Sequence, residues 1–242
     1  MAERRRRRKP DPAGPRRGGY ASPTASRLPG ALPAVVLTAA CIAAFARTVG
    51  HGFLLWDDRT FIAANPLITH PSAVNLVALW TTPLYDLYAP LTYTLWELLS
   101  ALFGPQPWAF HLTNVALHVL SACTVCALLR QLLEDHDTNA ALAGALLFAV
   151  HPLQTEAVAW ASATKDLLSA LLSLLAIRQY LLFRDSAQRR FYLGASAAFA
   201  CSLLAKPGAV FIPALLVILN RTIYRRDWAS SLRRQSSRRS SG

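Results

Sequence analysis

The 242-residue chain has few acidic residues and few cysteines, and it lacks the patterns of several common functional classes. It holds 13 Asp and Glu against 25 Lys and Arg, and only four cysteines. All four lie in apolar segments, and Cys123-Thr-Val-Cys126 has no second ligand pair, so we interpret them as buried small side chains. Histidines at close helical spacing, such as His-x-x-x-His, are also missing. This absence argues against a metal centre.

The basic excess is concentrated at the two ends of the chain. Residues 1–27 hold nine Lys and Arg and residues 221–242 hold seven, whereas the segment between them is almost neutral. These arginines do not alternate with aromatic residues, so we expect no nucleic-acid partner. We predict that residues 1–27 form a disordered basic cytoplasmic arm that touches anionic lipid, with a localisation or RNA-binding tail as the alternative. Residues 220–242 are predicted to be a basic, disordered cytoplasmic tail.

Hydrophobic residues make up 53% of the chain and occur in blocks, which is typical of a membrane protein. A helix needs about 20 residues to cross the hydrocarbon core, and the first block meets this length. We predict an all-α, polytopic membrane helical bundle over residues 28–219, with about six crossings and both termini in the cytoplasm. The expected crossings are Leu28–Val49, Trp108–Leu133, Thr138–His151, Leu167–Phe183 and two helices within Phe191–Leu219, separated at Lys206-Pro207.

The first outer loop is expected at residues 50–107. Within it, Ser72–Trp80 is predicted to be a short interfacial helix with Ser72 as its N-cap. Pro90–Phe103 is too short to span the bilayer, so we place it flat on the outer face or re-entrant.

This topology sends a set of ionisable side chains to the outer face, where a buried charge costs roughly 2.5–3.5 kcal/mol and rarely persists without a task. We assign Asp57 or Asp58 as a general base, with helix capping or loop solvation as the alternative. The spacing does not separate these two neighbours. Lys165 and Lys206 are candidate contacts to a donor phosphate, and snorkelling to the headgroups is their alternative.

Four further residues are supporting candidates: His111, His151, Glu156 and Asp166. A divalent cation is one interpretation of the histidines and Glu156, but these ligands are scattered along the chain. Hydrogen bonding between helices is favoured for His111 and for His118, which lies seven residues further along the same helix. Asp166 is expected to cap a helix that begins at Leu167.

An ordered series of motifs resembles one family. The motifs are Trp56-Asp-Asp58, Asn65-Pro66, Ala89-Pro-Leu-Thr-Tyr93, Gly104-x-x-Pro107, Phe110-His-Leu-x-Asn114, His151-Pro-x-x-Thr-Glu-Ala-Val-Ala-Trp160, Lys165-Asp-Leu-Leu168 and Lys206-Pro. Over about residues 35 to 228 the chain is similar to the N-terminal half of GT-C membrane glycosyltransferases. The particular class is the transmembrane O-mannosyltransferases that carry tetratricopeptide repeats, together with their bacterial relatives.

The resemblance implies a GT-C-like fold and a transferase that uses a polyprenyl-phosphate sugar as its donor. Such an enzyme would move a mannose-like sugar to Ser and Thr hydroxyls of a protein acceptor on the non-cytoplasmic face. In that class an acidic residue of the first outer loop is catalytic, and Asp57 and Asp58 occupy the matching positions. The expected location is the bacterial inner membrane or the endoplasmic reticulum membrane.

The chain also departs from the family pattern. It ends at Gly242, before the later transmembrane helices and the repeats, and Ala89 stands where an arginine often precedes Pro-Leu. Asn220 replaces a common acidic residue. A catalytically inactive, truncated membrane scaffold, or a lipid-phosphate-binding partner of another membrane transferase, is therefore the alternative. A transporter is disfavoured because the sequence contains no internal repeat.

Overall fold

The computed structural model describes residues 31–133 and 137–223 of the chain. Within these ranges every regular element is a helix, so the predicted all-α class is confirmed. The α-helices are α1 (Leu32–Phe45), α2 (Pro66–Thr69), α3 (Ala73–Thr81), α4 (Pro90–Phe103), α5 (Pro107–Leu132), α6 (Thr138–Val150), α7 (Gln154–Ala159), α8 (Thr164–Ser186), α9 (Arg189–Ala205) and α10 (Ile212–Ile223). Shorter turns are η1 (Ala46–Gly50), η2 (Arg59–Ala63), η4 (Ala161–Ala163) and η5 (Pro207–Phe211).

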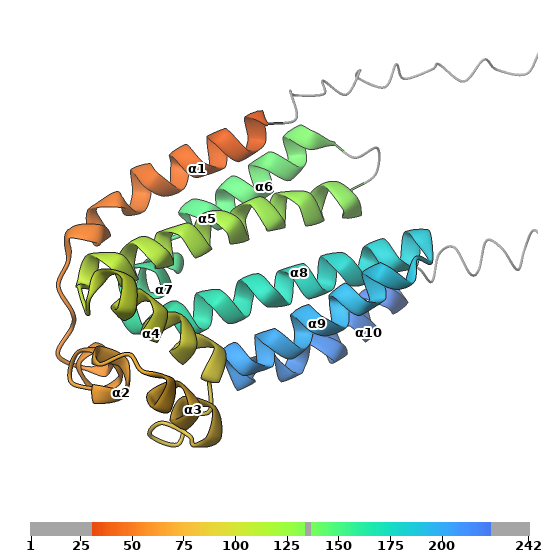
Figure 1. The fold of residues 1–242 in the computed structure, drawn as a ribbon. Coiled ribbons are helices and arrows are strands. Elements are labelled where there is room, and N and C mark those ends of the chain that lie inside the picture. Colours follow the sequence, from red (N-terminus) through yellow and green to blue (C-terminus); the bar gives the residue numbers. More distant parts are fainter. Residues whose placement is uncertain (1–30, 134–136, 224–242) are drawn as a thin grey trace, which may run out of the picture.

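The molecule is an elongated helical bundle with four further helices gathered at one end (Figure 1). Helices α1, α5, α6, α8, α9 and α10 run along roughly the same direction, and α2, α3, α4 and α7 lie together at one end of them. Three stretches in the described residues are long and apolar enough to cross a membrane, namely Leu32–Gly50, Pro107–Leu132 and Ala161–Ser186. Helix α6 has 13 residues, about 20 Å, which is shorter than the roughly 30 Å hydrocarbon core. The count of six crossings therefore stays a prediction.

The helix boundaries follow from local chemistry. Proline opens α4 and α5, where its fixed φ suits the first turn and its missing N–H is not needed. The carboxylate of Asp137 caps α6 by accepting from the backbone N–H groups of Asn139 at 2.9 Å and Ala140 at 3.2 Å. Gly104, at a φ of 71°, ends α4 in a conformation that glycine adopts without strain.

Small side chains allow α5 and α6 to approach each other closely. Ala122 on α5 and Ala141 and Ala145 on α6 are fully buried in one cluster, which also contains Leu37 of α1. Close backbone approach of this kind is how membrane helices gain packing energy. A Cβ on Gly144 would lie 2.7 Å from Cδ1 of Leu129, so a larger residue at this position requires the Leu129 side chain to shift.

The segment 51–106, between η1 and α5, folds into a packed unit, which we call the cap segment. Its core contains the fully buried side chains of Tyr93 and Trp96 on α4, packed with Ile62 and with Phe110 of α5. The predicted bounds of α4 are correct, and one face of this helix forms the core of the cap segment. Its place flat on the outer face or re-entrant stays a prediction. The predicted N-cap of α3 is also correct, because the Ser72 hydroxyl accepts from the N–H of Asn75 at 3.1 Å.

The prediction of two helices separated at Lys206-Pro207 is confirmed. Helix α9 ends at Ala205, and α10 returns to pack Ile212 and Leu216 against the apolar cluster at the C-terminal half of α8. Helix α10 continues to Ile223, beyond the predicted boundary at residue 219. The predicted arm at residues 1–27 and the rest of the predicted tail lie outside the described residues.

Candidate active site at one end of the bundle

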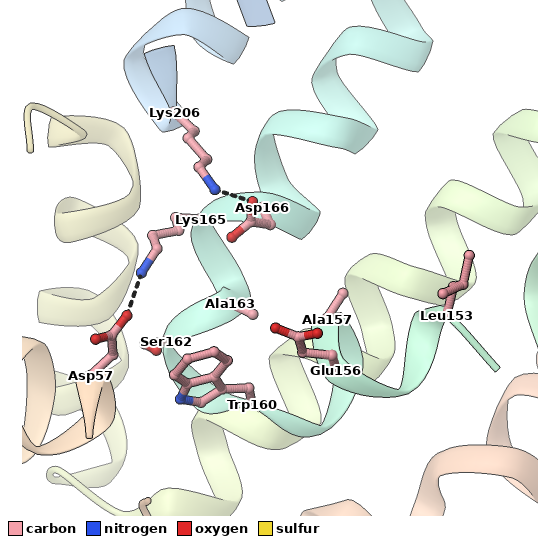
Figure 2. A pocket seen from close by; sticks show the side chains of 10 residues that line it. All are labelled: Asp57, Leu153, Glu156, Ala157, Trp160, Ser162, Ala163, Lys165, Asp166 and Lys206. Atoms are coloured by element: carbon pink, nitrogen blue, oxygen red, sulfur yellow. Dashed lines mark hydrogen bonds and ion pairs between the residues drawn. The ribbon is translucent and has the colours of Figure 1, made fainter. Parts of the chain in front are cut away.

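A cavity of about 350 Å³ opens at the end of the bundle that carries the cap segment and α7 (Figure 2). Its walls come from four separate parts of the chain: the turn before η2, the stretch from α7 to η4, the first turn of α8, and the end of α9. The lining residues are Asp57, Leu153, Glu156, Ala157, Trp160, Ser162, Ala163, Lys165, Asp166 and Lys206. Five of the eight residues predicted from the sequence therefore line one cavity.

Lys165 and Asp57 form an ion pair on one wall of this cavity. The Lys165 ammonium lies 3.6 Å from Oδ2 of Asp57 and 4.9 Å from the ring centroid of Phe61. Lys165 is largely buried, whereas the Asp57 side chain remains 40% exposed. The cation is therefore held by a carboxylate and an aromatic face, and the carboxylate stays accessible from the cavity.

A second ion pair joins Lys206 to Asp166, which follows Lys165 on α8 (Figure 2). The prediction that Asp166 caps a helix starting at Leu167 is wrong, because α8 begins earlier, at Thr164. Asp166 instead lies in the first turn of α8, where the helix dipole favours a negative charge and where its carboxylate faces Lys206.

Asp58 does not line the cavity and is fully buried. Its Oδ1 accepts from the backbone N–H of Ser162 at 2.7 Å, and its Oδ2 accepts from the N–H of Leu54 at 3.0 Å. A buried carboxylate needs such donors to offset the loss of water. Asp58 thus fastens the turn that carries Asp57 to the turn that precedes α8.

Asn114 also holds the turn before α8 in place by hydrogen bonds. The sequence patterns assigned no role to this residue. Its Nδ2 donates to the Trp160 carbonyl at 2.7 Å, and its Oδ1 accepts from the Thr164 hydroxyl at 2.7 Å. Asn114 is fully buried on α5, so these bonds hold the turn between α7 and α8 against the bundle. The sequence feature that could have identified Asn114 is its position inside a long apolar helix, because buried polar groups in membrane helices seldom lack a partner.

The end of α9, which presents Lys206, is fastened in a similar way. Thr92 on α4 donates to the carbonyl of Ala205 at 2.9 Å, and Ser169 on α8 donates to the carbonyl of Ser202 at 3.0 Å. These carbonyls belong to the last turn of α9, where helical N–H donors run out, and the Ser202 carbonyl also accepts from the N–H of Lys206 at 3.0 Å. The sequence patterns did not identify Thr92 or Ser169.

The predicted histidines do not line the cavity. His118 bonds through Nε2 to the Ala149 carbonyl at 2.9 Å, which matches the expected bonding between helices. His151 caps the turn after α6, where its Nδ1 accepts from the N–H of Leu153 at 3.2 Å. His111 is buried beside the ring of His51, at 6.2 Å between centroids, and within the described residues it makes no hydrogen bond to another helix, so this part of the prediction is wrong. Among the described residues, no group of three or more His, Cys, Asp or Glu side chains is placed to hold a metal ion.

Glu156, Trp160 and Ser162 form the remaining polar part of the lining. Glu156 projects from α7, and the Trp160 indole lies between it and Asp57 (Figure 2). Within the described parts of the chain, Nε1 of Trp160 and Oγ of Ser162 are buried without a hydrogen-bond partner. Buried polar atoms are usually satisfied, so this part of the cavity has unused bonding capacity.

This arrangement is suited to group transfer from an anionic carrier. Two ammonium groups can bind an anion and stabilise a leaving phosphate, and an exposed carboxylate beside them can take a proton from a hydroxyl. The cavity volume is within the usual range for small-molecule sites, about 300–1,000 Å³.

Comparisons with known proteins point to the same chemistry. The family model described as dolichyl-phosphate-mannose-protein mannosyltransferase matches residues 87–233. The chain is 34% identical to protein O-mannosyl-transferase Tmtc2 of Drosophila melanogaster over 188 residues, which is 72% of this chain and 20% of that protein. It is 37% identical to Drosophila Tmtc1 over 153 residues, or 58% of this chain and 17% of the relative.

The human protein O-mannosyl-transferase TMTC2 is 28% identical over 204 residues, 79% of this chain and 24% of its own length. The chain thus spans about one fifth of the length of these curated relatives. No solved structure matches it significantly.

Proposed function

Because the chain belongs to the dolichyl-phosphate-mannose-protein mannosyltransferase family, we propose that its cavity is the donor site of a membrane glycosyltransferase. The reaction is transfer of a mannose-like sugar from a polyprenyl-phosphate carrier to Ser and Thr hydroxyls of a protein acceptor on the non-cytoplasmic side. The relatives named above are protein O-mannosyl-transferases, which supports this choice of sugar and acceptor.

The observation that carries the proposal is the convergence of Asp57, Lys165, Asp166 and Lys206 on one cavity from three distant parts of the chain. Ionisable groups at the end of a membrane bundle are costly and tend to mark functional sites. Here each lysine already faces a carboxylate, so the site can hold positive charge without a bound anion.

We assign the role of general base to Asp57. Its carboxylate takes the proton of the acceptor hydroxyl while the hydroxyl oxygen forms the new bond to the anomeric carbon. The bond between that carbon and the phosphate oxygen breaks, and its electron pair leaves with the polyprenyl phosphate. Asp57 is better placed than Asp58 to act as the base, because only Asp57 is exposed to the cavity.

Lys165 and Lys206 are assigned to the departing phosphate. In the structure Asp57 is the partner of Lys165. When the donor phosphate replaces that carboxylate, Asp57 is released and can accept a proton. The exchange of partners at Lys165 therefore places donor binding before the proton transfer. Asp57 becomes available as a base only when the donor is bound.

The test is sugar transfer by membranes that contain the chain, supplied with polyprenyl-phosphate mannose and a Ser/Thr-rich peptide. Asp57→Asn keeps the size of the side chain and removes its basicity, and we expect a loss of at least about 100-fold in rate, typical of a missing general base. Asp86→Asn is the matched control, since Asp86 is exposed in the cap segment and does not line the cavity.

Full transfer by Asp57→Asn would exclude the assigned base. Wild-type chain that binds the donor but transfers no sugar would instead identify a lipid-phosphate-binding membrane protein, which uses the same lysines without the base.

A further inference from the structure

The cavity carries two ion pairs, and beside them it has a set of polar groups with no task in the proposed reaction. Glu156 is the one lining carboxylate that forms no ion pair within the described residues. Ser162 is 1% exposed and its hydroxyl has no partner in the described chain, although its backbone N–H is bound by Asp58. Trp160 adds an aromatic ring next to both residues (Figure 2).

We propose that Glu156, Trp160 and Ser162 form the sugar-ring subsite of this cavity, and that Glu156 determines which sugar is accepted. This inference rests on the proposed function and extends it to the part of the donor that is transferred. The ligand class is the ring of a neutral hexose attached to a polyprenyl phosphate.

The chemistry of these three side chains matches a neutral polyhydroxyl ring. A carboxylate accepts hydrogen bonds from hydroxyl groups, and bonds to a charged acceptor are stronger than those between neutral groups. An indole ring offers an apolar surface to C–H groups, together with a polar N–H at its edge. A serine hydroxyl both donates and accepts, so it can serve a ring hydroxyl in either direction.

The position of the subsite matches the division of the donor into charged and neutral parts. Lys165 and Lys206 lie towards one side of the cavity, and Trp160 with Glu156 lies towards the other (Figure 2). A phosphate at the lysines would leave the sugar beside Trp160, with Asp57 next to the bond that reacts. Because Asp57 and Glu156 both carry negative charge, a uronic acid would be repelled where a neutral hexose is accepted.

The test is equilibrium binding of two ligands to the full chain in lipid nanodiscs, polyprenyl-phosphate mannose and polyprenyl phosphate without sugar. The ratio of the two dissociation constants measures how much the sugar contributes to binding. We expect Glu156→Gln to weaken binding of the mannosyl lipid by about tenfold, the usual size for a hydrogen bond to a charged acceptor. Binding of the sugar-free lipid should stay within about twofold of the wild type, which also reports that the variant is folded.

Thr155→Ala is the control, because Thr155 lies on the same short helix and does not line the cavity. Like Glu156→Gln, Trp160→Leu should weaken binding of the mannosyl lipid relative to the sugar-free lipid. Thr155→Ala should leave the relative affinity for the two lipids unchanged. A third ligand, polyprenyl-phosphate glucuronate, should bind Glu156→Gln more tightly than the wild type, since one repelling charge is gone.

The inference is overturned if Glu156→Gln weakens both lipids equally, if it changes neither, or if the wild type does not distinguish the mannosyl lipid from the sugar-free lipid. These results leave the proposed function open to its own test, because the binding ratio does not depend on turnover. Conversely, retention of transfer in Asp57→Asn would remove the assigned base and leave the ratio measurable.

Discussion

Substitution of Asp58 by Asn separates its structural role from the catalytic role proposed for its neighbour. Both carboxylate oxygens of Asp58 accept backbone N–H groups, from Ser162 at 2.7 Å and from Leu54 at 3.0 Å, and the side chain is fully buried. Asparagine offers one acceptor oxygen and one NH₂ group. In either orientation of the amide, one of the two backbone donors then faces another donor.

The size of the effect can be worked from these contacts. One charge-assisted hydrogen bond is lost and one buried N–H is left unsatisfied, which costs about 1–3 kcal/mol. Removal of a buried charge offsets part of this cost, so we expect about 2 kcal/mol of lost stability. For a chain of this length that corresponds to a decrease of about 4–8 °C in Tm.

The assay is thermal unfolding of the purified chain in nanodiscs, followed by intrinsic tryptophan fluorescence. Asp57→Asn is the matched comparison, because its partly exposed ion pair with Lys165 contributes no more than about 1 kcal/mol. We expect Asp57→Asn to lower the Tm by no more than about 2–4 °C and to slow transfer by at least about 100-fold. Equal Tm values for Asp58→Asn and the wild type would refute the anchoring role of Asp58.

Three further predictions concern the lysines, Asn114 and the membrane orientation. Asp166→Asn should strengthen binding of polyprenyl phosphate about two- to fivefold by freeing Lys206, whereas Lys206→Gln should weaken it, and unchanged affinity in both would remove Lys206 from the phosphate site. Asn114→Ala should lower the free energy of unfolding by about 1–3 kcal/mol, because two hydrogen bonds between α5 and the turn before α8 are lost, although the Trp160 carbonyl keeps the Ala163 N–H and the Thr164 hydroxyl keeps the Ala161 carbonyl. Thr113→Ala, which loses only a bond inside α5, is its control in the same unfolding assay, and equal losses in both would contradict this account. In a cysteine-free background, a membrane-impermeant maleimide should label Leu55→Cys from the non-cytoplasmic side and Ser186→Cys from the cytoplasmic side, and the reverse pattern would invert the topology.

Much of the helical layout could be predicted because its signals are local. Proline at the start of α4, Ser72 before α3 and Lys206-Pro207 between α9 and α10 each act on the neighbouring few residues. The convergence of Asp57 with Lys165 and Lys206 was predictable for a different reason: topology alone sends all three to one end of the bundle.

The errors and omissions at the site concern contacts over long distances in the sequence. Asp166 was expected to cap a helix, but its partner Lys206 lies on another helix. The anchoring of Trp160 by Asn114 joins residues 46 positions apart, and no periodicity reports such a bond. Patterns of hydrophobicity describe which face of a helix is buried, and they do not describe which polar groups meet there.

The sequence by itself determined the all-helical membrane architecture and its break points, because apolar block length, charge distribution and capping residues act through the backbone and the bilayer. Only the tertiary structure placed Asp57 at the cavity and Asp58 in the interior. These adjacent residues are chemically identical, and only the approach of the Ser162 N–H, from 104 residues away, buries one carboxylate and leaves its neighbour facing the cavity.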